Sequence, residues 1–278
     1  MKKYSIILTH YNQMNYIFEA IDSILNQDYS NIELIITDDN SKDFNKEKIT
    51  NYIEKNKKDN LKNYDFIIND ENLGTVKTLN KALKKITGDY VQFLAADDAL
   101  YNTKVFSRFV DEFGKTKDYV ISAQAYMCGE TLDKITNKCI NSKKALKYNN
   151  KDARKEYEEM VRGCFYGAGA TCYDIKIFKE IGFPNEKYKL VEDWSYWLYI
   201  LKNNYHIRYC DFVAFLHRSG GISHYEKKDL PPHIIDYYKD IINIYDDIVL
   251  PEYDTFDLKT KTNIFLKYKY NVEFLQNN

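Results

Sequence analysis

The first hundred residues alternate between short apolar runs and segments with apolar residues at helical spacing, and this alternation restricts the fold more than any other feature. Four runs are typical of buried strands: Tyr4 to Leu8, Ile32 to Thr37, Tyr64 to Ile68 and Tyr90 to Leu94. Between them lie amphipathic stripes, the first of which is Ile17, Ala20, Ile21, Ile24 and Leu25. Strands separated by helices predict right-handed crossovers and a mostly parallel sheet.

Acidic turns follow two of the predicted strands. The second strand runs into Asp38-Asp39, and the fourth runs through Ala95 into Asp97-Asp98. Ligands of such sheets bind beyond the carboxyl ends of the strands, so we expect both acidic pairs near a ligand. The sequence contains neither G-x-G-x-x-G after the first strand nor G-x-x-x-x-G-K-[ST], which argues against NAD enzymes and P-loop NTPases.

The chemistry of these acids allows two interpretations. Asp97-Asp98 offers hard oxygen ligands suited to Mg²⁺ or Mn²⁺ that bridges a diphosphate, or else forms a solvated turn or helix cap. Asp38-Asp39 is suited to accept the N–H of a nucleotide base in a pocket flanked by Thr9 or Tyr11, or else forms an Asx-type turn. The residues alone do not decide between the two interpretations for either pair.

A third acidic pair, Glu192-Asp193, opens a helix with apolar residues at Trp194, Trp197, Leu198 and Leu201. Helix-dipole stabilisation and capping are a sufficient explanation for acids in a first turn. A carboxylate beside tryptophan in a partly apolar cleft is also suited to be a general base, because desolvation raises its pKa.

Six segments, in order, resemble the family 2 glycosyltransferases of the GT-A fold, and the match runs from about residue 4 to about residue 223. They are Ser5 to Asn12, Ala20 to Gln27, Thr37 to Ser41, Asn72 to Gly74, Gly88 to Val91 with Asp97-Asp98, and Glu192 to Trp194. The resemblance implies an α/β protein with a Rossmann-like, mostly parallel sheet flanked by helices. It also implies a metal-dependent, inverting enzyme of the hexosyltransferase type.

The resemblance further implies a nucleotide-sugar donor, UDP-linked, and a saccharide or lipid-linked glycan acceptor. Thr9 and Asp39 resemble the positions that contact uridine. Tyr11, Asp38 and Asn72 are expected near the base or the ribose. Bacterial surface polysaccharide synthesis is the setting that the family suggests.

The same resemblance assigns a cation site. Asp97 resembles the metal ligand of the D-x-D motif, for Mg²⁺ or Mn²⁺, and Asp98 resembles a neighbouring sugar or metal contact. His217 resembles a third metal or phosphate ligand, although a lone histidine is also common as a structural or surface residue. Ala95 occupies the first acidic position of the motif, so we expect weaker or water-mediated metal binding.

Asp193 resembles the catalytic base of the family's E-D motif. It would take the proton of the acceptor hydroxyl during a single displacement, and Glu192 would orient the acceptor or the sugar hydroxyls. The glycine-bearing stretch from Gly163 to Thr171 has a family counterpart near the donor sugar and the acceptor, and a strand-entry turn explains it equally well.

Two rival functions remain. Ala95 is compatible with a catalytically silent nucleotide-sugar or glycan-binding protein, which turnover would distinguish from an enzyme. A sugar-phosphate nucleotidylyltransferase would need a loop rich in Gly and Arg after the first strand, and the segment from Thr9 to Tyr16 contains neither residue.

We expect residues 1–223 to form the glycosyltransferase domain, with a nucleotide-binding half at 1–98 and an acceptor and catalytic half at 99–223, followed by a helical extension at 224–278. In the extension, an apolar seam is suited to pack on the core or on a second copy in a homodimer: Ile234, Tyr238, Ile241, Tyr245 and Ile248. Lysines around Ile264 to Leu266 either form a solvated face or contact an anionic membrane: Lys259, Lys261, Lys267 and Lys269.

Charge and cysteine content indicate the compartment. The formal net charge of -1 lacks the strong basic signature of proteins that coat nucleic acid, so no nucleic-acid partner is expected. No apolar run approaches the roughly 18 residues of a membrane span. The five cysteines include no C-x-x-C pair, which favours free thiols over disulfides or zinc. The sequence therefore predicts a cytoplasmic protein, with peripheral contact at the inner face of the cytoplasmic membrane as a hypothesis.

Overall fold

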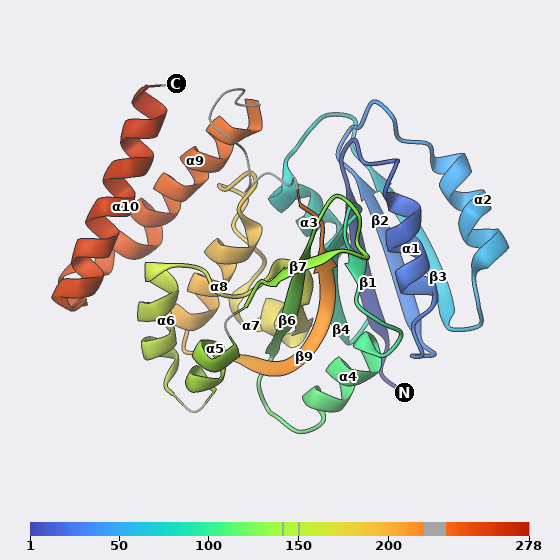
Figure 1. The fold of residues 1–278 in the computed structure, drawn as a ribbon, viewed down its shortest axis with the longest axis horizontal. Coiled ribbons are helices and arrows are strands. Elements are labelled where there is room, and N and C mark those ends of the chain that lie inside the picture. Colours follow the sequence, from blue (N-terminus) through green and yellow to red (C-terminus); the bar gives the residue numbers. More distant parts are fainter. Residues whose placement is uncertain (141, 150, 220–231, 278) are drawn as a thin grey trace.

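The computed structural model describes residues 1–140, 142–149, 151–219 and 232–277. Nine strands form one mixed sheet in the order β3-β2-β1-β4-β8-β6-β9-β5, with β7 paired to β6 (Figure 1). The strands are β1 Tyr4–His10, β2 Ile32–Asp38, β3 Leu61–Ile68, β4 Tyr90–Ala95, β5 Ala99–Leu100, β6 Val120–Cys128, β7 Ile135–Lys138, β8 Thr171–Asp174 and β9 Ile207–His217. The helices are α1 Ile17–Leu25, α2 Lys46–Asn56, α3 Thr75–Leu83, α4 Val105–Phe113, α5 Ser142–Tyr148, α6 Ala153–Arg162, α7 Lys176–Ile181, α8 Glu192–Lys202, α9 Pro232–Ile244 and α10 Leu258–Gln276.

The first four strands confirm the predicted parallel arrangement. β1 pairs in parallel with β2 and with β4, and β2 pairs in parallel with β3. In this register Thr9 lies between Thr37 and Ala95. The acidic turns that follow β2 and β4 therefore start at the same edge of the sheet.

The second half of the sheet is mixed. β8 is inserted antiparallel between β4 and β6, whereas β6 pairs in parallel with β9. The two-residue strand β5 pairs antiparallel with β9, so that Ala99 lies opposite Leu216. This pairing places His217, at the end of β9, beside the turn between β4 and β5.

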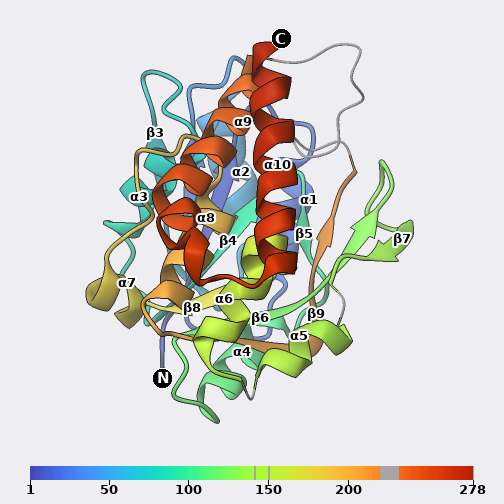
Figure 2. The ribbon, with the colours of Figure 1, turned by 90° about the vertical axis from the view of Figure 1, so that its left-hand side faces the viewer.

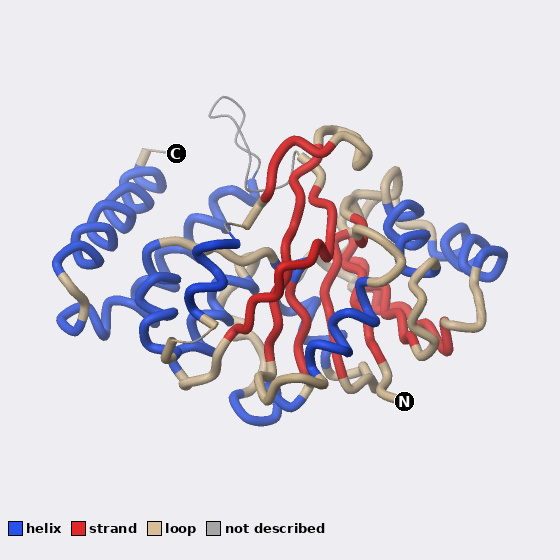
Figure 3. Tube along the Cα trace, turned by 60° about the horizontal axis from the view of Figure 1, so that its bottom comes forward, coloured by secondary structure: helices blue, strands red, loops and turns tan. Residues whose placement is uncertain are grey.

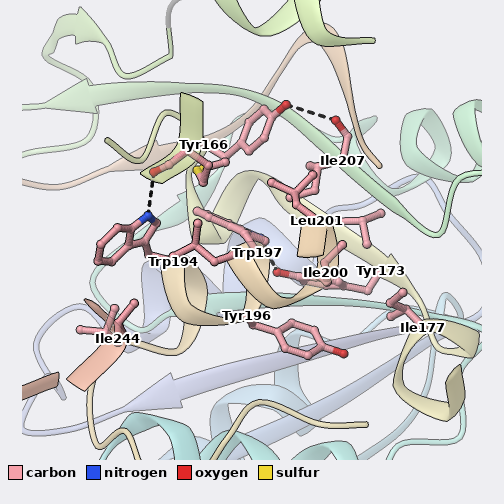
Figure 4. Packing of buried hydrophobic residues seen from close by; sticks show 14 of the residues in the cluster. Tyr166, Tyr173, Ile177, Trp194, Tyr196, Trp197, Ile200, Leu201, Ile207 and Ile244 are labelled. Carbon is pink, nitrogen blue, oxygen red and sulfur yellow. Dashed lines mark hydrogen bonds between the residues drawn. The ribbon is translucent and has the colours of Figure 1, made fainter. Parts of the chain in front are cut away.

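Helices cover both faces of the sheet (Figure 3). On one face, α1, α2 and α4 bury residues such as Ile21, Ile53 and Phe106 against β1 and β2. The other face carries an aromatic core in which Trp197 donates a hydrogen bond to the Tyr173 hydroxyl at 2.9 Å (Figure 4). Burial of these apolar surfaces supplies the main stabilising contribution to the fold.

The C-terminal helices pack on this same core. The predicted seam continues past the end of α9 into a π-helical turn, Tyr245–Val249. Tyr245 and Ile248 of the seam belong to the cluster that contains Trp194, and Ile241 packs against it, so this part of the seam packs on the core of its own chain. Packing on a second copy in a homodimer stays a prediction. α10 lies beside α9 on the outside of the molecule (Figure 2). The expected boundary at residue 223 lies outside the described residues.

Among the described residues, we find no helix that combines the length and the apolarity needed to cross a membrane.

Gly74, which precedes α3, provides a first testable prediction. Its φ is 84°, and a Cβ atom built on it would lie 2.4 Å from Cγ and 2.5 Å from the backbone oxygen of Lys189. Gly182 has nearly the same backbone, with φ 85°, but a Cβ there would have nothing within 4 Å. We expect Gly182→Ala to lower the free energy of unfolding by about 2 kcal/mol through backbone strain. Gly74→Ala should lose about 2 kcal/mol more through overlap.

Denaturant titration of the two variants measures this difference. Equal losses for Gly74→Ala and Gly182→Ala would show that the Lys189 backbone moves away without cost, and that the contact between Gly74 and Lys189 is loose.

Candidate functional site

A cavity of about 360 Å³ lies at the edge of the sheet where β1 and β4 end. Its walls come from both halves of the chain, from β1 and β4 to α8 and β9. Five of the ten residues predicted for the site line this cavity: Thr9, Asp98, Glu192, Asp193 and His217. The fold thus brings together carboxylates that are separated by about a hundred residues in sequence.

The turn after β4 forms one acidic part of the site. Asp98 is only 5% exposed, and its carboxylate accepts hydrogen bonds from the backbone N–H of Arg218 at 2.9 Å and from Nδ1 of His217 at 3.1 Å. Burial and the neighbouring Asp98 carboxylate raise the pKa of Asp97 to about 6. A carboxyl group with a raised pKa resists ionisation, and a cation bound to Asp97 would relieve that cost.

The side chains of this turn fit a cation only in part. In the described parts of the chain, no three His, Cys, Asp or Glu side chains are arranged to hold a metal ion by themselves. Mg²⁺ commonly takes one or two carboxylates and completes its coordination with substrate phosphates and water. Asp97, with Asp98 and His217 beside it, fits that kind of site and not an all-protein cage.

His217 is oriented by Asp98. Burial lowers its pKa, the hydrogen bond to Asp98 raises it, and the net shift is upward. A carboxylate that accepts from one ring nitrogen is the usual partner of a histidine whose other nitrogen binds a metal or a ligand.

Arg218 is a site residue to which the sequence interpretation gave no role. Its Nε donates to the backbone oxygen of Asp97 at 2.8 Å, and Nη2 lies 2.5 Å from the Glu19 carboxylate. The guanidinium also stacks on the ring of Tyr16, 4.4 Å from its centroid. Arg218 therefore fixes the acidic turn to α1 and to the end of β9. The only signal in the sequence is its position directly after His217.

Glu192 and Asp193 occupy the first turn of α8 and line the cavity. One Asp193 oxygen accepts from the backbone N–H of Trp194 at 2.5 Å, as expected for an acid in a first turn. Burial raises the pKa of both carboxyl groups, and the adjacent Asp193 charge raises that of Glu192 further. Such a pair combines the structural and the chemical interpretation of these acids, because a place in the first turn, where the helix dipole favours negative charge, is compatible with base character.

Asp38 lies in the interior beside the cavity region. Its carboxylate accepts from His10 Nδ1 at 2.9 Å and from the Ser41 backbone N–H at 3.1 Å. His10 Nε2 in turn accepts the backbone N–H of Gln13 at 3.1 Å, which assigns the proton to Nδ1. Burial raises and the His10 contact lowers the pKa of Asp38, with a net downward shift. This network joins the loops that follow β1 and β2.

Asp39 holds the beginning of α3. Its carboxylate accepts the backbone N–H groups of Leu73 at 2.8 Å and Gly74 at 2.9 Å, and the Thr78 hydroxyl at 3.0 Å. Asn72 donates from its amide to the backbone oxygen of Asp39 at 3.4 Å. Asp39 therefore positions the segment that leads to Thr75, a further residue of the cavity wall.

The remaining predicted positions are more open. Tyr11 is 48% exposed and Asn72 is exposed. With Asp38, Asp39 and Asp97, they are the five predicted residues that do not line the cavity.

The glycine-bearing stretch forms another wall. Gly167 and Gly169 line the cavity, as does the ring of Phe215. A Cβ on Gly169 would lie 2.8 Å from that ring, so glycine is required for the close approach of this turn to β9. Tyr166 and Phe215 are lining residues that the sequence interpretation missed, because aromatic residues occur throughout this chain and those of a cavity wall carry no distinct pattern.

The comparisons with known proteins agree with this geometry. The sequence profile described as "Glycosyl transferase family 2" matches residues 5–181. An uncharacterized glycosyltransferase of Haemophilus influenzae is 31% identical over 199 residues, 71% of each chain. The Escherichia coli UDP-Glc:alpha-D-GlcNAc-diphosphoundecaprenol beta-1,3-glucosyltransferase WfaP is 28% identical over 237 residues, 83% of each chain.

A solved structure shows a similar fold. Mannosyltransferase PcManGT from Pyrobaculum calidifontis, in complex with GDP-Man and Mn²⁺, superposes with a TM-score of 0.64 at 15% identity, covering 99% of this chain and 73% of that one. Other relatives are longer, and the chain spans 58% of a Rickettsia typhi glycosyltransferase and 31% of those from Rickettsia felis and Rickettsia conorii.

Proposed function

Because the chain belongs to glycosyl transferase family 2, we propose that it moves a sugar from a nucleoside-diphosphate sugar to a hydroxyl group of a saccharide or glycoconjugate, with inversion at the anomeric carbon. The observation that carries this proposal is the shared cavity. Asp98 and His217 stand at one part of its wall, and Glu192 and Asp193 at another. The donor diphosphate needs a place that can hold a cation, as beside Asp98 and His217, and the acceptor hydroxyl needs a proton-accepting carboxylate, as at Asp193, within the same site.

We propose UDP as the nucleotide, since the Escherichia coli relative is named for UDP-Glc as its donor. The solved structure with GDP-Man supports only the fold, because its identity to this chain is low. Thr9, between Thr37 and Ala95 in the sheet register, and Asp39 are the proposed uridine contacts. Tyr11 and Asn72 are exposed beside them, and Asp38 would act by holding the loops through His10.

For the cation, Asp97 is the proposed ligand, with Asp98 and His217 as its neighbours and the donor diphosphate completing the coordination. When bound, Mg²⁺ or Mn²⁺ would stabilise the charge that develops on the leaving diphosphate. Arg218 would contribute by holding the turn in place through the Asp97 backbone oxygen.

Asp193 is the proposed general base. Its carboxylate would accept the proton of the acceptor hydroxyl while that oxygen forms a bond to C1 of the sugar. The bond between C1 and the phosphate oxygen breaks, and its electron pair leaves with the nucleoside diphosphate. The raised pKa makes Asp193 a stronger base than an exposed aspartate, and Glu192 would orient the hydroxyl by hydrogen bonding.

Turnover tests this proposal. The protein is incubated with UDP-glucose, and with GDP- and dTDP-sugars for comparison, in the presence of Mn²⁺ and saccharide acceptors, and release of free nucleotide is measured. The rival of a silent binding protein, suggested by Ala95, predicts donor binding without release. The Asp193→Asn variant, compared with the parent, tests the assignment of the base.

Peripheral membrane contact is a further part of the proposal, since the Escherichia coli relative is named for a lipid-linked acceptor. The outer side of α10 exposes Phe265 and Leu266, which are 58% and 59% accessible, with Lys259 and Lys269 nearby on the exposed surface. Apolar side chains flanked by lysines suit the surface of an anionic bilayer. Lys267 is less available, because its ammonium donates to the Arg162 backbone oxygen.

We expect the chain to sediment with vesicles containing anionic lipid at low salt and to release at high salt. Phe265→Ser with Leu266→Ser should weaken this binding about tenfold, since roughly 1 kcal/mol or more of apolar burial is lost. Equal binding to neutral vesicles, or dimerisation through α10 in place of vesicle binding, would contradict the membrane proposal.

A further inference from the structure

The three residues before α8 form a segment that connects the site to the C-terminal helices. We call Lys189–Val191 the lead-in segment. It ends directly at Glu192, so its backbone sets where the first turn of α8, and with it Asp193, begins. Val191 has no polar side chain with which to cap the helix.

A single carboxylate from α9 binds the whole lead-in segment. Asp240 accepts the backbone N–H of Lys189 at 2.8 Å, of Leu190 at 2.6 Å and of Val191 at 3.1 Å, all on Oδ2. Its Oδ1 lies 3.0 Å from the Lys189 nitrogen as well. Asp240 is only 3% exposed, so these N–H groups take the place of water around the carboxylate.

The other side of the lead-in segment contacts α3. The backbone oxygen of Lys189 accepts the N–H of Val76 at 3.2 Å, and Gly74 approaches Lys189 closely. Gly74 in turn donates to Asp39 at 2.9 Å. A continuous set of contacts, in which the carboxylates of Asp39 and Asp240 accept backbone N–H groups, therefore joins the loop after β2, the start of α3, the lead-in segment and α9.

We propose that Asp240 is a positioning residue for Glu192 and Asp193, and that α9 is thereby a working part of the active site although none of its described residues lines the cavity. This inference rests on the proposed role of Asp193 as the base. Asp240 would act in two ways. It fixes the backbone from which the two acids project, and it places a negative charge close to them.

The effect of the Asp240 charge on the two acids can be distinguished from the effects of the other groups near them. The groups that interact electrostatically with Glu192 and its neighbour Asp193 are Asp240 and Tyr237 of α9, Tyr173 of β8 and the thiol of Cys164. Of these, Asp240 is the only one with a carboxyl group. The Asp240 charge adds to burial and to the Asp193 charge in raising the pKa of Glu192.

The variants Asp240→Ala and Asp240→Asn test the proposal, with Asp236→Asn as the matched control. Asp236 lies one turn earlier on α9 and contacts the same residue, but through the Lys189 ammonium at 2.8 Å and not through the backbone. Alanine removes every acceptor, whereas asparagine keeps one acceptor oxygen and removes the charge.

We expect kcat to fall about 100-fold in Asp240→Ala and about 10-fold in Asp240→Asn, because small misplacements of catalytic groups have effects of this size. The donor KM and the donor Kd should change less than about threefold, since the hydrogen bonds of Asp240 go to the lead-in segment and not to the proposed donor contacts. Asp236→Asn should resemble the parent. Loss of the Asp240 charge removes one of the causes that raise the pKa of Glu192, so a limb of the kcat–pH profile that reports Glu192 should move to lower pH in Asp240→Asn.

Three outcomes would overturn the proposal. They are parent-like kcat in Asp240→Ala, equal losses in Asp236→Asn and Asp240→Asn, or a loss of donor binding that parallels the loss of kcat. Donor binding, measured by titration, also shows whether each variant is folded. If the parent releases no nucleotide, the proposed function has failed; if Asp193→Asn retains the parent rate, the base assignment on which this inference rests is wrong, whatever Asp240 does.

Discussion

Replacing Asp193 by Asn is expected to lower kcat for sugar transfer by about 1,000-fold, within the range that a positioned general base contributes. The amide has nearly the shape of the carboxylate but cannot take the proton of the acceptor hydroxyl. Donor binding should persist, because the proposed nucleotide contacts lie on other elements. The measurement is initial nucleotide release at saturating donor and acceptor, alongside a binding titration with the donor.

The stability of this variant provides an independent check. Burial raises the pKa of Asp193 in the folded chain, so the folded state binds this proton more tightly than the unfolded state. The stability of the parent should therefore fall as pH rises from the ordinary aspartate range to beyond the raised pKa. Asp193→Asn lacks this ionisation, and its Tm at pH 8 should equal or exceed that of the parent. Transfer at the parent rate would remove Asp193 from the mechanism, and a strongly lowered Tm would point to a structural role.

Removal of divalent cations is expected to lower the transfer rate at least about 100-fold, since stabilisation of the developing charge is worth several kcal/mol. The protein is treated with EDTA, dialysed and assayed before and after addition of Mn²⁺ or Mg²⁺. Asp97→Asn should require more metal for half-maximal activity. Asp133→Asn, on an exposed turn between β6 and β7, is the control and should not change the metal requirement.

Full activity after chelation would remove the role proposed for Asp97. An unchanged metal requirement in Asp97→Asn would also argue against it, and would shift attention to Asp98 and His217. Because Ala95 replaces the first acid of the motif, the metal affinity of the parent without donor is expected to be low.

The parts of the fold that depend on local pattern could be predicted from the sequence. β1, β2 and β4 begin at the predicted residues, and α1 spans the predicted stripe, since periodicity and turn residues act over short distances. The spacing of Leu79, Leu83 and Ile86 predicts a helix that continues to Ile86, whereas α3 ends at Leu83, because helix ends respond to tertiary contacts more than to apolar spacing. The antiparallel insertion of β8 was not predicted. A four-residue strand carries too little pattern to show which neighbours it joins.

In the site, too, the features that depend on local sequence could be predicted and those that depend on long-range contacts could not. That Glu192 opens a helix, and that Asp98 and Asp193 share a cavity, agree with the sequence analysis. The interior hydrogen bonds of Asp38 and Asp39 could not be foreseen, because an acidic turn has the same residues whether it accepts from a ligand or from the backbone. Arg218 and Asp240 act across gaps of about a hundred and about fifty residues, and such pairings appear only once the elements have docked. The division of the chain at residue 223 stays a prediction.

The order in which the site is assembled has a consequence for protein synthesis. Thr9 precedes Asp240, the partner of the lead-in segment, by more than two hundred residues. A nascent polypeptide of two hundred residues would already contain the acids of the site, but not Asp240 of α9, which holds the lead-in segment. The acids at 192 and 193 would thus acquire the backbone support proposed for α9 only once residue 240 has been synthesised.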